Sequence, residues 1–255
     1  AQAATIDSDV RGLVEQGVSV YRLDADKLAE LAPDGIVTQS PCELCAVSVE
    51  EVEAALHDGM GSHNTPPRLV SLEPMTFDDV MTDIRNLSKA LACDALGELL
   101  VREMRAGFAN LTEAVSGQAR KSVFFMEWTA PLMGAGNWMP EIISYGGGDV
   151  VLGENGRHSP TVMWEDIHAA DPDVIIVGPC GFDVGRAREE LSTLTNGASW
   201  QSLRAVQERE VYIVNGNHFY NRPGPRLLES AQIIGEILNP TCVPKIDNSE
   251  RWQKW

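Results

Sequence analysis

Three cysteines occupy positions where thiols could act together. Cys42 and Cys45 form a C-x-x-C pair in the stretch TQSPCELCAV (38–47), and Cys180 lies in a second Pro-Cys sequence. A C-x-x-C pair ahead of a helix can exchange disulfides, because the helix N-terminus stabilises a thiolate. The three thiols could instead hold zinc or iron in a site with one open position. Two further interpretations stay open: contact with a bound metal complex, or packing of small side chains at tight turns.

A second set of residues with binding chemistry follows apolar, strand-like runs. Aromatic side chains offer broad contact to a flat ligand, and amide, guanidinium or carboxylate groups can hold its periphery. The candidate ligand-binding residues are Glu73, Trp128, Asn137, Trp138, Asn217, Phe219, Tyr220, Asn221 and Arg222. For any of the tryptophans, packing in a core is an equal alternative. Arg222 precedes a predicted helix, where it could either contact an anionic group or cap neighbouring carbonyls.

Two histidines and one further tryptophan carry weaker signals. His218 and His158 could be axial ligands of cobalt or iron, because imidazole suits such metals. Loop histidines are more often simply solvated. Trp164 lies on a predicted amphipathic helix and is assigned to the core.

Short β-type runs alternate with helical patterns along the chain, which predicts an α/β fold with parallel sheets and crossover helices. Expected strands cover 35–38, 68–72, 122–127, 174–177 and 211–214. Expected helices cover 27–32, 49–57, 76–91, 95–116, 139–145, 162–169, 184–194 and 225–238. Ser159 is expected to cap the 162–169 helix, with Pro160 in its first turn. The tail after residue 238 is expected to be irregular.

An internal repeat predicts two similar lobes. Residues 32–42 resemble residues 171–180, and each copy runs from Pro-Asp through an apolar strand to Pro-Cys. We therefore expect two Rossmann-like lobes joined by one long helix: residues 1–93, a linking helix over 94–117, and residues 118–255. Ligands of parallel α/β sheets bind beyond the carboxyl ends of the strands, so Cys42 and Cys180 are expected near a shared cleft.

Composition excludes several classes of function. The formal net charge of −17 would repel a phosphate backbone, so no nucleic-acid partner is expected. No apolar run reaches the roughly 18 residues that span a membrane. No secretory signal opens the sequence, and the first residues, AQAAT, look like the interior of a longer protein. The sequence has no G-x-S-x-G, H-E-x-x-H or P-loop motif, so no enzyme activity is expected.

Several phrases, spread in order over nearly the whole chain, resemble one family. It is the helical-backbone metal-receptor class of substrate-binding proteins, class III of the periplasmic type, and in particular its cobalamin-binding-protein-like branch. The phrases are PDGIVTQ (33–39), CELCAVS (42–48), SLEP (71–74), MEW (126–128), GNWMPE (136–141), WED (164–166), DPDV (171–174), GPCGF (178–182) and NRPGPR (221–226).

The resemblance implies a non-enzymatic protein that captures a metal-containing tetrapyrrole between its lobes. Cobalamin is the first candidate, and haem or an iron siderophore are alternatives. The implied partners are an ABC transporter permease or a larger protein assembly. The family implies a periplasmic or cell-surface location, whereas an odd number of cysteines favours reduced thiols and leaves a cytoplasmic or organellar location open.

The chain departs from the family at its start, because members usually begin with a further strand and helix. Two other functions therefore remain alternatives. One is a thiol-dependent metal-binding or redox protein that uses Cys42, Cys45 and Cys180. The other is a structural subunit derived from this fold.

Overall fold

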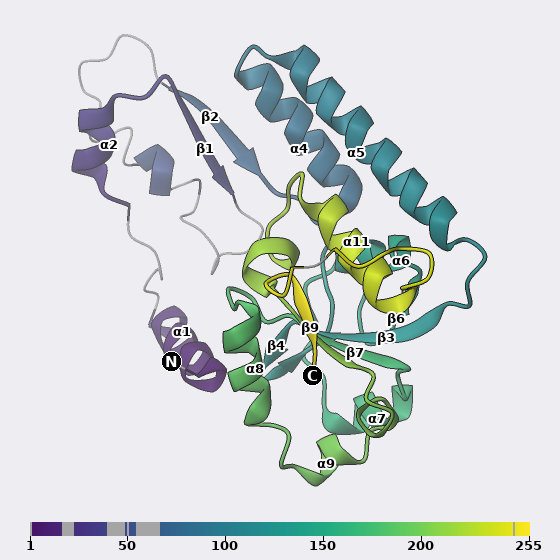
Figure 1. Ribbon diagram of the computed structural model, residues 1–255. Helices are drawn as coiled ribbons and strands as arrows, with labels where there is room; N and C mark the ends of the chain where they lie inside the picture. The colour runs from purple at the N-terminus through teal and green to yellow at the C-terminus, as the bar shows by residue number, and fades with distance from the viewer. Residues whose placement is uncertain (1, 17–22, 40–48, 50, 55–66, 247) are drawn as a thin grey trace.

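The structure of the 255-residue chain is a computed structural model. It describes every residue except 1, 17–22, 40–48, 50, 55–66 and 247. A pair of parallel strands and a five-stranded sheet lie in different parts of the molecule, and a hairpin of two helices runs along one side (Figure 1). The expected α/β class, with parallel sheets joined through one long helix, is confirmed.

The first part of the chain carries the strand pair. Its elements are α1 (Ala3–Glu15), α2 (Ala25–Leu31), β1 (Gly35–Gln39) and β2 (Arg68–Leu72). Strands β1 and β2 pair in parallel from Gly35 opposite Arg68 to Gln39 opposite Leu72. Both strands match the expected ranges closely. Of the helix expected over 49–57, the structure describes residues 49 and 51–54, which are helical. Helix α1 was not expected.

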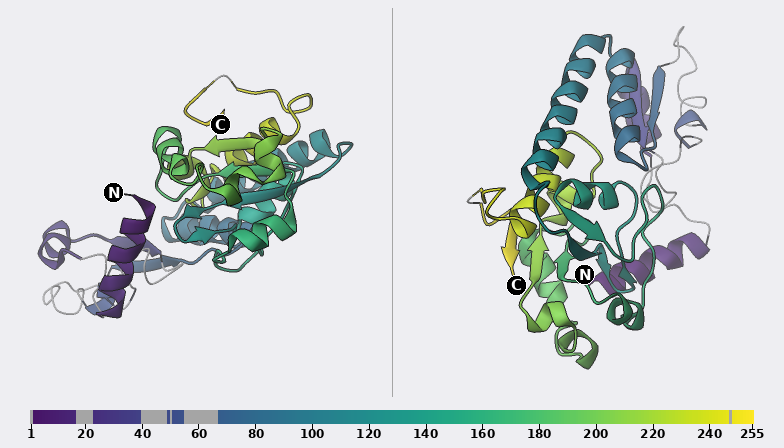
Figure 2. Two further views of the ribbon diagram at one scale, coloured as in Figure 1. Left: turned by 90° about the horizontal axis from the view of Figure 1, so that it is seen from below. Right: turned by 90° about the vertical axis from the view of Figure 1, so that its right-hand side faces the viewer.

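Two helices form the hairpin. Helix α4 (Phe77–Ala90) begins with a capping box between Thr76 and Asp79, and α5 (Asp94–Val115) follows it. The 22 residues of α5 confirm the long helix expected over 95–116 and correspond to about 33 Å. Figure 2 shows α4 and α5 side by side, with α5 running on toward the five-stranded sheet.

The hairpin shares its hydrophobic core with the C-terminal part of the chain. Phe77 of α4 packs edge-on against Phe108 of α5, with ring centroids 4.5 Å apart, and both contact Tyr145. The backbone N–H of Phe77 also donates to Glu141 Oε2 across 2.8 Å. The start of α4 is therefore fixed to the C-terminal part by packing and by a hydrogen bond.

The five-stranded sheet has the order β6-β3-β7-β8-β9. Its strands are β3 (Lys121–Met126), β6 (Gly148–Val150), β7 (Val174–Val177), β8 (Val211–Val214) and β9 (Trp252–Lys254). The first four neighbours pair in parallel, whereas β9 is antiparallel to β8. Every residue of β7 and β8 is buried, which explains their unbroken apolar sequence, since helices cover both faces of a parallel sheet.

Helices and short elements surround this sheet. They are the β4–β5 hairpin (Trp128–Thr129 and Leu132–Met133), α6 (Met139–Tyr145), α7 (Trp164–Ala170), α8 (Val184–Ser192), α9 (Ala198–Gln201), α10 (Arg204–Gln207), the π-helix η1 (Gly216–Tyr220) and α11 (Leu227–Leu238). Alternate residues of β3 enter different cores: Val123 and Phe125 face the cluster that contains α5 and α11, whereas Phe124 and Met126 face the cluster that contains α8.

Two expectations about local structure are wrong. Ser159 does not cap the helix near residue 162, because α7 begins at Trp164 and Met163 is its N-cap residue. Residue Thr161 forms a bridge with Met133 instead, so this segment is extended. The C-terminal tail is also not wholly irregular, because β9 completes the sheet. The sequence did not predict this strand, because the alternation of Trp252, Gln253 and Lys254 is too short to be recognised.

Candidate functional site

Three loops meet where neighbouring parallel strands end. The first residues after β3, β7 and β8 are Glu127, Gly178 and Asn215. The N–H of Gly178 donates to Met126 O at 3.0 Å, and the N–H of Cys180 donates to Glu127 O at 3.2 Å, which ties the first two loops together. This carboxyl edge is the position at which open α/β sheets bind ligands.

The third loop packs closely against the second. Asn215 caps η1 by accepting the His218 N–H at 2.9 Å, and the Asn217 N–H donates to Phe182 O at 3.0 Å. A Cβ on Gly216 would lie 2.1 Å from Pro179 O, so only glycine allows this approach. The loop that carries five of the predicted ligand residues is therefore held in one position by the chain after β7.

The polar residues of this third loop largely bind one another. Arg222 donates through Nε to Asn217 O at 2.8 Å and through Nη2 to Asn217 Oδ1 at 3.1 Å. Asn221 Nδ2 donates to Gly216 O at 3.0 Å. Arg222 thus donates to a neighbouring carbonyl, as one of its two interpretations expected. The Arg222 side chain is exposed, so it also remains accessible to an anionic group.

A pair of aromatic rings lies beside the first two loops. The half-buried ring of Trp128 lies 5.4 Å from that of Phe182, and Trp128 Nε1 donates to Ala130 O at 3.0 Å. The guanidinium of Arg186 stacks on the Phe182 ring at 3.8 Å. Phe182 was not among the predicted site residues, although its position just after the Pro-Cys sequence could have indicated it.

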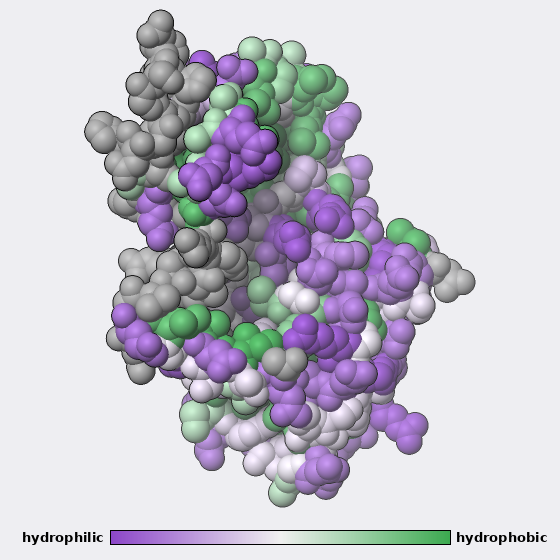
Figure 3. Space-filling view, turned by 90° about the vertical axis from the view of Figure 1, so that its left-hand side faces the viewer, coloured by the Kyte–Doolittle hydropathy of each residue, from purple (hydrophilic) through white to green (hydrophobic). Residues whose placement is uncertain are grey.

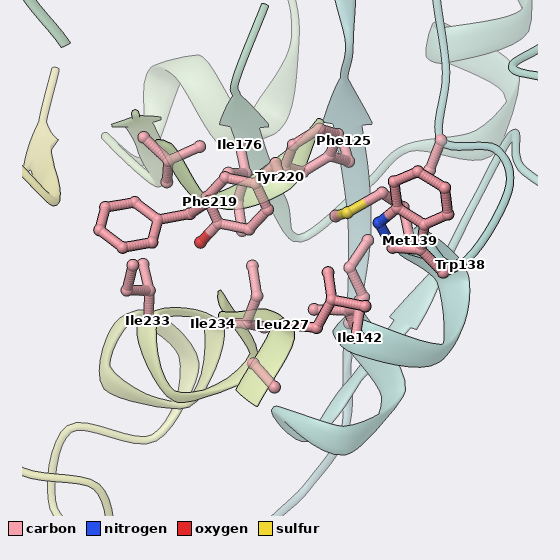
Figure 4. Close-up of a cluster of buried hydrophobic side chains, with 14 of the residues drawn as sticks. Phe125, Trp138, Met139, Ile142, Ile176, Phe219, Tyr220, Leu227, Ile233 and Ile234 are labelled. Carbon is pink, nitrogen blue, oxygen red and sulfur yellow. The ribbon is translucent and has the colours of Figure 1, made fainter. Parts of the chain in front are cut away.

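The other three predicted aromatic residues lie in the core. Trp138, Phe219 and Tyr220 belong to the same buried cluster as Phe125 (Figure 4). Tyr220 has no exposed surface, and its hydroxyl donates to Ser230 O at 3.3 Å. Burial raises the pKa of the Tyr220 hydroxyl well above its usual value. Their core placement suits a role beneath the loops rather than in broad contact with a ligand.

A carboxylate follows β3, and one of its hydrogen-bond donors is the residue before an asparagine. The side chain of Glu127 accepts hydrogen bonds from Ser159 Oγ, at 2.7 Å, and from the N–H of Gly136. Burial raises the pKa of Glu127 even though both hydrogen bonds oppose that shift. Asn137 follows Gly136, and its buried Oδ1 has no hydrogen-bond partner among the described residues. Sequence reasoning missed Glu127, although a carboxylate directly after a buried strand was a usable signal.

Glu73 follows β2 and lies in the other part of the molecule. It is exposed and accepts a hydrogen bond from Ser71 Oγ at 3.1 Å. It belongs to an acidic group with Asp79 and Asp83. Burial, and then the charges of Asp79 and Glu73, raise the pKa of Asp83 to about 6.

The part that contains β1 and β2 and the part that contains the five-stranded sheet approach each other beside Asn137. A Cβ on Gly156 would lie 3.3 Å from the methyl group of Thr76, and the Gly156 N–H donates to Asn137 O at 3.0 Å. The face of the molecule on the side of β1 and α1 is hollowed between the two parts (Figure 3). The Glu127–Asn137 group thus lies near the boundary where a ligand held by both parts would sit.

The predicted thiol site is only partly visible. Cys42 and Cys45 lie outside the described residues, so their approach to Cys180 stays a prediction. Cys180 is exposed at the carboxyl edge. In the part of the chain that the structure describes, no three His, Cys, Asp or Glu side chains are grouped so that they could hold a metal ion. His218 and His158 are exposed, and Trp164 packs against Trp200 as expected for a core residue.

These features define a class of protein: an α/β protein whose loops gather at one sheet edge, opposite a second parallel strand pair. The chain belongs to the periplasmic binding protein family, whose model matches residues 18–217. A curated relative is the vitamin B12-binding protein of Vibrio cholerae serotype O1, 23% identical over 169 residues that cover 64% of this chain and 56% of the relative. The chain therefore matches little more than half the length of this relative.

Solved structures share the fold at low sequence identity. An ABC transporter substrate-binding protein from Listeria monocytogenes EGD-e superposes with a TM-score of 0.71 and 14% identity, over 86% of this chain and 81% of that one. The periplasmic vitamin B12 binding protein of Vibrio cholerae gives a TM-score of 0.61 and 20% identity, over 87% and 80%. A periplasmic heme-binding protein from Pseudomonas aeruginosa gives 0.65 and 16%, over 88% and 78%. Among the described residues, no helix is long and apolar enough to cross a membrane.

Proposed function

We propose that this chain is a substrate-binding protein that captures a metal-containing tetrapyrrole at the carboxyl edge of its five-stranded sheet, with cobalamin as the first candidate. The observation that supports this most directly is the partly exposed Trp128 ring, which packs against the buried Phe182 ring next to the loops after β3, β7 and β8. A flat ring that is partly exposed at such an edge, as Trp128 is, can contact a macrocycle, and the adjoining amides can hold its periphery.

The resemblance of the chain to vitamin B12-binding proteins favours cobalamin over the alternatives. Haem and iron siderophores remain alternatives, because heme-binding proteins have the same fold. Capture and release need no bond to be made or broken, so we propose no enzyme activity. Membership of the same family supports two further parts of the proposal: delivery to an ABC transporter permease and a location outside the cytoplasmic membrane.

The proposal is tested by titrating the protein with cyanocobalamin and with haem, using absorbance and calorimetry. We expect saturable binding of cyanocobalamin, weakened at least about tenfold in Trp128→Ala, which corresponds to about 1.4 kcal/mol. Trp255→Ala is the matched control, because Trp255 is 40% exposed and lies at the other end of β8, where its N–H donates to Val211 O. Failure of both ligands to saturate the protein would contradict the proposal.

A second candidate is a thiol-dependent metal-binding or redox protein. The observation in its favour is that Cys180 is exposed at the carboxyl edge, where the sequence repeat also predicts Cys42. Metal analysis of freshly prepared, reduced protein distinguishes the two. Stoichiometric zinc or iron that is lost in Cys42→Ser would support this candidate. A metal-free protein that binds cyanocobalamin would rule it out.

A further inference from the structure

The group formed by Glu127, Gly136, Asn137 and Ser159 contains hydrogen-bond acceptors and lies beside the boundary between the two parts. The carboxylate of Glu127 is fixed by the Ser159 hydroxyl at 2.7 Å and by the Gly136 N–H. A Cβ on Gly136 would lie 2.3 Å from Ser159 N, so the chain around the carboxylate leaves no room for a side chain there. The carboxylate is therefore held in one orientation.

The backbone of Asn137 is held just as firmly. Its N–H donates to Arg157 O at 2.5 Å, its carbonyl accepts from the Gly156 N–H at 3.0 Å, and its φ of 51° lies in the left-handed region. Asparagine tolerates this conformation better than most residues. Oδ1 of Asn137 is buried and has no partner in the described part of the chain. An unpaired buried acceptor costs about 1–3 kcal/mol, so a ligand that donates a hydrogen bond there would recover that cost.

The charges around the group disfavour an anion. A negatively charged ligand group at Asn137 Oδ1 would meet an acceptor that cannot donate a hydrogen bond to it, and it would lie near the Glu127 carboxylate, which the N–H of the preceding residue holds. A cationic residue, Arg157, contacts Asn137 through its backbone carbonyl. Its side chain, however, is exposed to solvent and pairs with Glu154 at 3.6 Å. An uncharged primary amide meets no such repulsion and supplies the N–H that Asn137 Oδ1 lacks.

We propose that Asn137 and Glu127 are specificity-determining residues that accept a hydrogen bond from a peripheral carboxamide of the ligand and reject a carboxylate at the same position. This inference rests on the proposed function and narrows its ligand class. Ligands whose periphery carries uncharged amides, as in corrinoids, are selected, and ligands that carry carboxylates there, as haem does, are disfavoured.

The test compares two ligands with the same corrin ring. Cyanocobalamin is titrated against a set of its monocarboxylic acids, in each of which one peripheral amide is hydrolysed. We expect wild type to bind at least one of these acids more than about tenfold more weakly than cyanocobalamin, which corresponds to about 1.4 kcal/mol. In Glu127→Gln, which removes the negative charge, that ratio should fall below about threefold.

Asn137→Gly removes the acceptor but keeps a residue that suits a positive φ. We expect this substitution to weaken the binding of cyanocobalamin and to leave the affinity for the discriminated acid nearly unchanged. Glu154→Gln is the matched control, because it removes an exposed carboxylate from the segment that also carries Arg157 and Ser159, and it should keep the wild-type ratio. Thermal melts of all variants report whether the fold is kept.

The outcomes separate this inference from the proposed function. Equal affinity of wild type for cyanocobalamin and every acid would overturn the inference and leave the proposed function standing. A second adverse result is a ratio of affinities for cyanocobalamin and the discriminated acid that stays at the wild-type value in Glu127→Gln and Asn137→Gly. That result would show that other residues distinguish the amide from the acid, and it would also overturn the inference. Failure of wild type to bind any of these corrinoids would overturn both.

Discussion

The guanidinium of Arg251 and the carboxylate of Glu236 form a buried ion pair, with 2.7 Å between Nη1 and Oε1. The other oxygen of Glu236 accepts a hydrogen bond from Trp252 Nε1 at 2.8 Å. Together they attach the C-terminal strand β9 to α11. The carbonyl of Arg251 also accepts the N–H of Asn215, so the same tail reaches the loop after β8.

Removal of one partner of this ion pair should destabilise the fold strongly. In Glu236→Leu, the buried guanidinium of Arg251 loses its closest carboxylate, and we expect the free energy of unfolding to fall by about 3–5 kcal/mol. Chemical denaturation measures it. The double variant Glu236→Leu/Arg251→Met should regain most of the loss, because it leaves no buried unpaired charge: the other carboxylate beside Arg251, that of Glu229, is 38% exposed. A double variant no more stable than the single one would contradict this explanation.

Gly216 should be intolerant of a side chain. In Gly216→Ala the new Cβ meets backbone oxygen of Pro179, so the loop after β8 must shift, at a cost of about 1–3 kcal/mol. We expect a lower melting temperature and weaker ligand binding. Gly224→Ala is the control in the same loop, because no atom of the described chain lies within 4 Å of its Cβ position. Equal effects of the two substitutions would contradict the steric explanation.

Asn215 should position the ligand loop. Its Oδ1 accepts the His218 N–H, and its Nδ2 donates to Glu250 O at 3.1 Å. In Asn215→Ala both contacts are lost, and we expect about 1–3 kcal/mol less stability. Ligand affinity, measured far below the melting temperature, should also fall. Unchanged affinity in a variant with lowered stability would limit Asn215 to a structural role.

Asp83 should make stability depend on pH. Its pKa is raised to about 6, above the ordinary value of 3.8, so between these values the folded chain binds more protons than the unfolded chain. Stability should therefore fall as the pH rises through this interval. Asp83→Asn should reduce that slope, leaving the part that the raised pKa of Glu127 contributes, and stabilise the protein at pH 7 by about 1 kcal/mol or less, since solvent screens the partly exposed Asp83. Denaturation of both proteins at pH 4, 5, 6 and 7 checks this, and a slope in the variant as steep as that of wild type would refute it.

The strands and long helices could be predicted because their own sequences carry the pattern. β7 and β8 are uninterrupted apolar runs, and the stripe of α5 from Val101 to Val115 repeats at helical spacing. The strand β9 could not be predicted, because its three residues gain their conformation from pairing with β8. Local sequence contains no sign of such a distant partner.

The sequence predicted where the candidate site lies, but not which of its side chains are buried. The loops after β3 and β8 lie at the same sheet edge, as inferred from parallel strands. Whether an aromatic ring there faces solvent or the core depends on packing: Trp128 stays partly exposed, whereas Tyr220 packs inward against Phe125. Glu127 was not predicted as a site residue, because the contacts with Gly136 and Ser159 that orient its carboxylate arise only in the folded chain.

The long helix α5 has a consequence for dissecting the protein. The proposed units end at residues 93 and 117, the two ends of this helix, yet its buried side chains Met104, Phe108 and Leu111 share one core with α6 and α11. A fragment that begins at residue 118 would leave that wall of the core open to water. Expression of residues 76–255 should therefore yield a soluble, cooperatively melting protein, whereas residues 118–255 alone should aggregate.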